Sequence, residues 1–190
     1  FAGGAVLPLA DLRGLRSFAD DAGVRVHLDG ARIWNAHVAT AVPLEQYGAV
    51  ADAMAVCLSK GLGAPVGSLV LGSADAIAGA RVWRKRLGAG MRQVGVLAAA
   101  GLYALDHHLD RLADDHEHAR LLAEAVGLDP ATVDTNIVVF EHADAAEFVR
   151  AAAEQGVRIA TVGPTTVRLV THLDVTRVDA QQAAAILTAL

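Results

Sequence analysis

The chain has 190 residues, of which 54% are hydrophobic and 19% charged, and its formal net charge is −5. Such a composition can fill a sizeable core, unlike that of disordered chains, and the negative charge disfavours a nucleic-acid partner, which calls for a basic surface. Charged residues interrupt every apolar run before it reaches the roughly 18 residues of a membrane span, so we expect a soluble protein.

The single cysteine and the first residues indicate the cellular compartment of the protein. Cys57 has no second cysteine with which to form an internal disulfide, which fits a reducing compartment and predicts a cytoplasmic protein. The N-terminus lacks the charged segment, apolar segment and cleavage site of a signal peptide, so we expect none. The chain begins at Phe1 and not at a methionine, so Phe1 need not be the natural start.

The first 72 residues alternate between helical and strand patterns. Apolar spacing predicts helices over 9–22 and 31–41. Alternation with period two predicts a strand over 24–29. Two continuous apolar runs of strand length predict strands that are buried on both faces, over 53–58 and 66–72.

Helical patterns dominate from Ser73, a suitable N-cap, to Val126. Helices are predicted over much of 74–87 and 93–126, with breaks near 88–90 and around His107. After Gly127 the pattern changes again. Strands are predicted over 136–140, 157–161 and 166–171, and helices over 143–155 and 178–190.

This order of elements predicts two domains. Strand–helix–strand units come first, and a segment of mixed strands and helices with a hairpin follows them. We therefore expect an α/β domain with a parallel-type sheet over 1–110 and a small α+β domain over 111–190. The boundary between them is expected between 105 and 134.

Asp29 and Lys60 each follow a predicted strand. A helix joins the two strands, which predicts that they are parallel neighbours and end at the sheet edge where open α/β sheets bind ligands. Asp29 and Lys60 are separated by 31 positions, which fits one strand–helix–strand unit. The pattern alone leaves two plainer interpretations open, because Asp29 could cap the next helix and Lys60 could be a solvated loop lysine.

Four separated motifs, in order, resemble the low-specificity L-threonine aldolases, which are pyridoxal-phosphate enzymes of the aspartate-aminotransferase fold (fold type I). The longest is Val-Cys-Leu-Ser-Lys-Gly-Leu-Gly-Ala-Pro-Val-Gly-Ser at 56–68. The others are His-Leu-Asp-Gly-Ala-Arg at 27–32, Trp-Arg-Lys at 83–85 with Gly-Met-Arg-Gln at 90–93, and Arg-Leu-Val-Thr-His-Leu-Asp-Val at 168–175. The resemblance covers nearly the whole chain and implies a partial large domain followed by the small domain.

The resemblance implies a role for each matching residue. Lys60 would carry pyridoxal 5'-phosphate as a Schiff base, and Asp29 would keep the pyridine nitrogen protonated. Arg32 and Arg168 would bind the substrate carboxylate through two parallel hydrogen bonds, and Arg32 would also belong to the cofactor-binding residues. Without the resemblance, Arg32 could be a solvated residue of a first helical turn and Arg168 a cross-strand ion-pair partner.

Lys85 and Arg92 match cationic positions near the active site of such enzymes. The resemblance implies that they contribute to substrate binding, either in their own subunit or in a neighbouring one. On pattern alone Lys85 belongs to a basic exposed helix face.

Four histidines at 107, 108, 116 and 118, interleaved with acidic residues, also indicate a polar helix face. Their spacing is not that of a zinc site, so we expect no metal.

The resemblance implies cleavage of β-hydroxy-α-amino acids, such as threonine or allo-threonine, to glycine and an aldehyde. It also implies a homotetramer, and a substrate that is a small amino acid and not a nucleic acid or membrane. Members of the family are longer upstream of Phe1, where they carry the phosphate-binding loop and the catalytic histidines. The alternatives are another fold-type-I lyase, an amino-acid racemase, or a catalytically incomplete part that serves only in assembly. The general base, the stereochemical preference and the true substrate are not encoded in these motifs.

Overall fold

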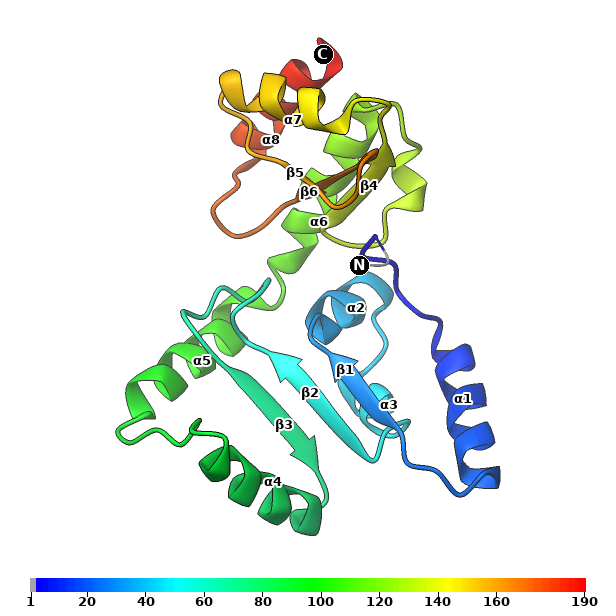
Figure 1. Ribbon diagram of the computed structural model, residues 1–190, viewed down its shortest axis with the longest axis vertical. Coiled ribbons are helices and arrows are strands. Elements are labelled where there is room, and N and C mark those ends of the chain that lie inside the picture. Colours follow the sequence, from blue (N-terminus) through cyan, green and yellow to red (C-terminus); the bar gives the residue numbers. More distant parts are fainter. Residues whose placement is uncertain (1–2) are drawn as a thin grey trace. The chain divides into compact units, whose positions relative to one another are not determined.

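The computed structural model describes residues 3–190 (Figure 1). The chain divides into two compact units, Leu7–Asp110 and Arg111–Leu190, and the second also includes the described residues up to Val6. Each unit contains a three-stranded sheet. No helix formed by residues 3–190 is long and apolar enough to cross a membrane.

The first unit alternates helices and strands, as the sequence predicts. Its elements are α1 (Leu9–Asp21), β1 (His27–Gly30), α2 (Ile33–Thr40), α3 (Leu44–Gly48), β2 (Ala53–Cys57), β3 (Ser68–Gly72), α4 (Ala74–Arg86) and α5 (Gly95–His108). Strand β1 begins later than predicted because the Val26 N–H is used by the carboxylate of Asp52, at 2.8 Å. The short helix α3 was not predicted, because five residues are too few to show a helical period.

The three strands lie side by side in the order β1–β2–β3 (Figure 1). β1 and β2 are parallel, with Asp29 opposite Ala55, which confirms the predicted pairing. β3 runs antiparallel to β2, with Ser68 opposite Cys57, so the sheet is mixed and not wholly parallel. β3 begins directly after the loop that contains Lys60 and runs back alongside β2.

The prediction that β3 is buried on both faces is wrong. All five of its residues are exposed, and Leu69, Val70 and Leu71 expose 45%, 54% and 46% of their surface. An open apolar cavity of about 360 Å³ lies beside the strand, and Ile33, Met54, Leu69 and Leu71 are among its lining residues. An apolar run indicates what a strand can bury, whereas the elements packed against it decide what it does bury.

The second unit is an α+β domain. Its elements are α6 (Leu112–Ala125), a 3-10 helix (Pro130–Thr132), β4 (Ile137–Glu141), α7 (Ala145–Glu154), β5 (Ala160–Thr161), β6 (Thr166–Val170) and α8 (Arg177–Thr188). The strands are antiparallel in the order β4–β6–β5. β5 is shorter than the predicted strand because the Val157 N–H closes the end of α7 on the Ala152 carbonyl, at 2.9 Å.

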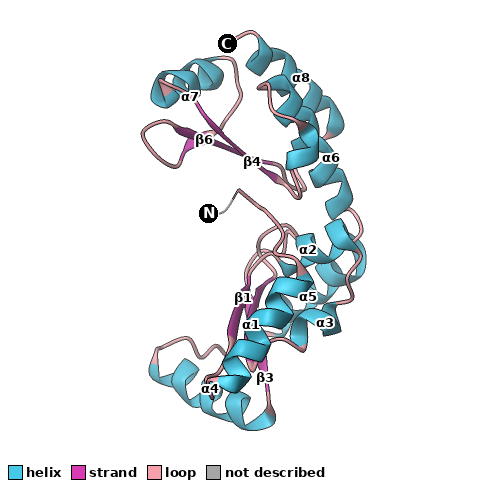
Figure 2. Ribbon diagram, turned by 90° about the vertical axis from the view of Figure 1, so that its right-hand side faces the viewer, coloured by secondary structure: helices cyan, strands magenta, loops and turns pink. Residues whose placement is uncertain are grey.

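Helices α6, α7 and α8 cover one face of this sheet and share one core with it (Figure 2). Val167 and Leu169 of β6 are buried in that core, together with Leu122 and Phe148. Side chains alternate along a strand, so Arg168, between Val167 and Leu169, points to the opposite face of the sheet.

The prediction of a polar helix face is wrong for the two histidines of α6. His116 and His118 are only 2% and 7% exposed, because α6 packs against α8 and β4. Within residues 3–190 no group of three or more His, Cys, Asp or Glu residues is arranged to hold a metal ion.

Burial of His116 predicts a loss of stability in acid. Desolvation, with a smaller effect of the Arg120 charge, lowers the His116 pKa from 6.5 to about 4. The unfolded state therefore binds the proton first as the pH falls below 6.5, which lowers the free energy of unfolding by about 2 kcal/mol at pH 5 and about 3 kcal/mol at pH 4. The free energy of unfolding, measured with urea at pH 7.5 and pH 5, should therefore change less with pH in His116→Gln than in the unsubstituted protein. An unchanged pH dependence would contradict this assignment, and His107→Gln is the exposed control.

Candidate active site

Lys60 lies in the loop 58–67, which joins β2 to β3. The Leu58 N–H donates to the Gly67 carbonyl at 2.9 Å, and the Ala64 N–H donates to the Leu58 carbonyl at 3.1 Å. The Gly63 N–H closes a turn on the Lys60 carbonyl at 2.8 Å. The backbone of Lys60 is therefore held within the loop, while its side chain is exposed.

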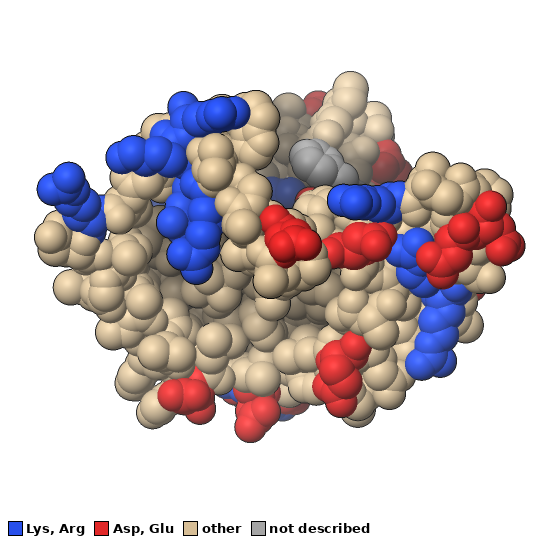
Figure 3. Space-filling model, turned by 90° about the horizontal axis from the view of Figure 1, so that it is seen from below, with Lys and Arg blue, Asp and Glu red and all other residues tan. Residues whose placement is uncertain are grey.

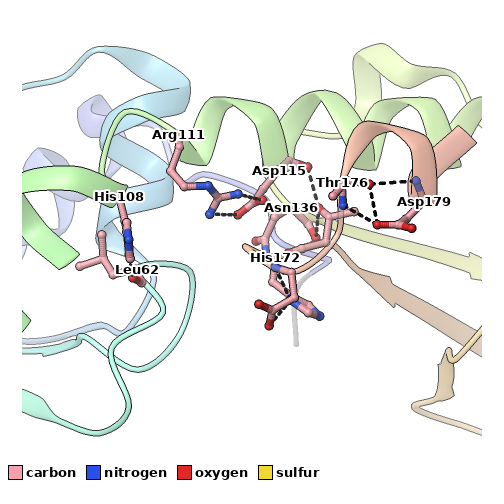
Figure 4. A network of polar contacts seen from close by, with 10 residues as sticks. Leu62, His108, Arg111, Asp115, Asn136, His172, Thr176 and Asp179 are labelled. Carbon is pink, nitrogen blue, oxygen red and sulfur yellow. Dashed lines mark hydrogen bonds and ion pairs between the residues drawn. The ribbon is translucent and has the colours of Figure 1, made fainter. Parts of the chain in front are cut away.

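Three contacts fix the loop 58–67 to the rest of the first unit. Leu62 is completely buried, and its carbonyl lies 2.7 Å from Nδ1 of His108, at the end of α5 (Figure 4). Nε1 of Trp34 in α2 donates to the Cys57 carbonyl at 2.8 Å, just before the loop. A Cβ on Gly101 would lie 2.9 Å from Cδ1 of Leu58, so glycine at this position of α5 permits close packing.

Asp29 is the last residue but one of β1. The parallel register places Gly30 opposite Val56, so β1 and β2 end at the same edge of the sheet, ahead of Ala31 and Lys60. Oδ1 of Asp29 accepts a hydrogen bond from the Ala31 N–H at 3.1 Å, and the side chain is exposed. None of the ion pairs formed within residues 3–190 includes Asp29 or Lys60.

Arg32 stands at the N-cap position of α2, three residues after Asp29, and is half-buried. Its carbonyl accepts the first hydrogen bonds of the helix, from the N–H groups of Asn35 and Ala36 at 3.1 and 3.3 Å. Its guanidinium takes part in none of the ion pairs of the described chain. A carboxylate ligand could therefore use it.

Arg168 belongs to the second unit. Its neighbours across the sheet are Val139 in β4 and Ala160 in β5, which carry no charge, so the cross-strand ion-pair interpretation is wrong. Its Nε is buried and has no hydrogen-bond partner among the described residues. A buried guanidinium N–H without an acceptor has a strong tendency to bind an anion.

Lys85 and Arg92 are both exposed, the first in the last turn of α4 and the second in the segment after it. Figure 3, which views the molecule from below, shows several Lys and Arg side chains gathered on its upper left side. Arg86 stacks over Trp83, at 5.1 Å from the ring centroid. The basic exposed helix face expected from the pattern is present in the last turn of α4.

The structure thus brings Asp29, Arg32 and Lys60 to one edge of the first unit's sheet. Trp34 and His108, which fix the lysine loop, were not predicted as site residues. Trp34 lies two residues after the motif at 27–32, and this proximity could have marked it as a candidate site residue. His108 lies 46 residues from Leu62 and has no sequence signal that connects it with the loop.

The amino-acid sequence of the chain is similar to those of known proteins over most of its length. The model of the beta-eliminating lyase family matches residues 1–146. A probable low-specificity L-threonine aldolase 2 from Arabidopsis thaliana is 40% identical over 190 residues, covering 94% of this chain and 54% of that protein. The low specificity L-threonine aldolase of Escherichia coli (strain K12) is 41% identical over 194 residues, covering 96% of this chain and 56% of that protein. The chain spans about half the length of the curated relatives it matches.

Solved structures show the same fold. A threonine aldolase from Leishmania major superposes with a TM-score of 0.81 at 19% identity, covering 99% of this chain and 58% of that one. N-acetylornithine aminotransferase from Stenotrophomonas maltophilia superposes with a TM-score of 0.66 at 18% identity, covering 94% and 50% of the two chains. The fold predicted from the motifs and the resemblance to L-threonine aldolases are both confirmed.

Proposed function

Because the chain belongs to the beta-eliminating lyase family, we propose that it forms the lysine-bearing part of a pyridoxal-phosphate enzyme that cleaves β-hydroxy-α-amino acids. The products would be glycine and an aldehyde, and threonine and allo-threonine are the substrates proposed. The observation that carries the proposal is Lys60, unpaired with any carboxylate among residues 3–190, in a loop at the edge where Asp29 also lies. The identity of about 40% to proteins named as threonine aldolases supports it.

The side chains at this edge fit pyridoxal phosphate. Lys60 would hold the cofactor covalently, since its amine is exposed and engaged in no ion pair of the described chain. Asp29 would hold the protonated pyridine nitrogen, and its Oδ2 accepts no hydrogen bond from residues 3–190. When bound, the cofactor supplies an electron sink for the bond that breaks at Cα.

The substrate carboxylate would be bound by Arg32 and Arg168. A guanidinium meets a carboxylate with two parallel hydrogen bonds, which also orient the scissile Cα–Cβ bond. The buried Nε of Arg168, unpartnered among the described residues, supports this role. Lys85 and Arg92 are proposed as further cationic groups, in a cytoplasmic homotetramer with active sites between subunits. Segments outside these 190 residues would supply the phosphate site and the general base.

Release of glycine tests the proposal. The longer protein that contains this chain, loaded with pyridoxal phosphate, is incubated separately with L-threonine, L-allo-threonine and D-alanine. Glycine is expected from one or both hydroxy amino acids, with an equal amount of acetaldehyde. Formation of L-alanine from D-alanine without any glycine would instead support a racemase, and the absence of glycine contradicts the aldolase.

A role in assembly alone is the second candidate, and the exposed apolar strand β3 favours it. Apolar strand edges and faces of this kind associate with other chains. In that case the longer protein would show no visible absorbance band from a lysine-bound cofactor. The presence of this band distinguishes the two candidates before any activity is measured.

A further inference from the structure

We propose that His108 is a positioning residue for Lys60, which acts through the peptide group between Leu62 and Gly63. This inference rests on the proposed function of Lys60. Nδ1 of His108 lies 2.7 Å from the Leu62 carbonyl oxygen (Figure 4). A carbonyl only accepts hydrogen bonds, so Nδ1 carries the proton and donates it.

The peptide group that accepts this hydrogen bond also contacts Lys60. Its carbonyl belongs to Leu62, and its N–H, on Gly63, donates to the Lys60 carbonyl at 2.8 Å. Because a peptide group is planar and rigid, the orientation of the carbonyl fixes the direction of the N–H. One imidazole therefore sets the hydrogen bond that closes the turn around Lys60.

The environment of this contact makes it hard to replace. Leu62 is completely buried, so its carbonyl has little access to water if His108 is removed. The imidazole itself is half-buried and contacts Tyr103, five residues earlier in α5, edge-on with 5.5 Å between ring centroids. The neighbouring His107 also contacts Tyr103, stacked with 4.1 Å between ring centroids, but it is exposed.

Three variants of the cofactor-loaded longer protein test the inference. His108→Ala removes the donor, His108→Asn keeps an N–H donor of similar reach, and His107→Ala is the matched control on the same tyrosine. The measurements are the pH midpoint of the lysine-bound cofactor's absorbance band, kcat and KM for threonine, and amide hydrogen exchange at Gly63 and Ala64.

We expect His108→Ala to shift the pH midpoint and to lower kcat about tenfold, with little change in KM, because a misplaced reactive group costs rate more than binding. Exchange at Gly63 should become about tenfold faster, since its hydrogen bond to Lys60 opens more often. His108→Asn should restore most of each property, and His107→Ala should change none of them.

Two results would overturn the inference. One is a His108→Ala protein with a normal band, a normal pH midpoint and normal exchange at Gly63. The other is a His108→Asn protein no better than His108→Ala, which would indicate a merely structural role for the ring. Should the unsubstituted protein show no band at all, the proposed function fails, and exchange at Gly63 alone decides whether His108 orders the loop.

Discussion

Replacement of Lys60 by alanine should abolish the absorbance band of the bound cofactor and lower glycine formation by about 10⁴-fold or more, as the loss of a covalent catalytic group does. The amine of Lys60 is the group to which the cofactor would attach, and its loop leaves it exposed at the sheet edge. Absorbance spectroscopy of the loaded protein measures the first effect, and glycine release measures the second.

The chain offers a matched control, because Lys60 and Lys85 are its only two lysines. Lys85→Ala should keep the band, whatever its effect on activity. Lys60→Arg should lose it, since the guanidinium keeps the charge but not the nucleophilic amine. Borohydride reduction followed by peptide mass analysis should place the cofactor on the peptide that contains Lys60, and its recovery on Lys85 would refute the assignment.

Removal of Arg111 should cause the largest loss of stability in the second unit. Its guanidinium forms an ion pair with Asp115, which is completely buried (Figure 4). Burial raises the pKa of Asp115, and Arg111 opposes that shift. In Arg111→Met the carboxylate stays buried without its cation, which should lower the free energy of unfolding by about 3–5 kcal/mol at pH 7.

The accompanying variants separate charge from packing. Asp115→Asn in the Arg111→Met background should recover part of the loss, because no buried charge is left unpaired. The deficit of Arg111→Met should also shrink in acid, where Asp115 binds a proton. Arg177→Met removes an exposed ion pair with Glu117 and should cost about 1 kcal/mol at most. Urea unfolding at pH 7 that shows equal losses for Arg111→Met and Arg177→Met would contradict the prediction.

The parallel pairing of β1 with β2 could be predicted because it follows from local rules. A strand, a helix and a second strand within 31 residues leave few other arrangements, and Asp29 and Lys60 are carried to the same edge. The last helix was likewise predicted, over 178–190, and the structure has α8 at Arg177–Thr188, where Thr176 and Asp179 form a reciprocal capping box. These features depend on residues that are close in sequence, and the sequence pattern therefore predicts them.

Features that depend on distant contacts could not be predicted. The exposure of β3 depends on what packs against it, and an apolar run does not record that. His116 looks polar in the sequence, yet α6 turns it into the protein interior. The contact between His108 and Leu62 joins residues that a linear pattern treats as unrelated. For the same reason, the buried Nε of Arg168 was visible only in three dimensions.

The exposure of β3 also changes what the loop 58–67 must do. Among residues 3–190, Leu69, Val70 and Leu71 are exposed to similar degrees, so burial within this part of the protein does not distinguish the observed register from one shifted by a residue. One contact that holds the register at the loop is the hydrogen bond from the Leu58 N–H to the carbonyl of Gly67, whose φ of +128° suits glycine and few other residues. The length of the loop is therefore as constrained as its sequence, and a one-residue deletion within it would misalign β3 as well as displace Lys60.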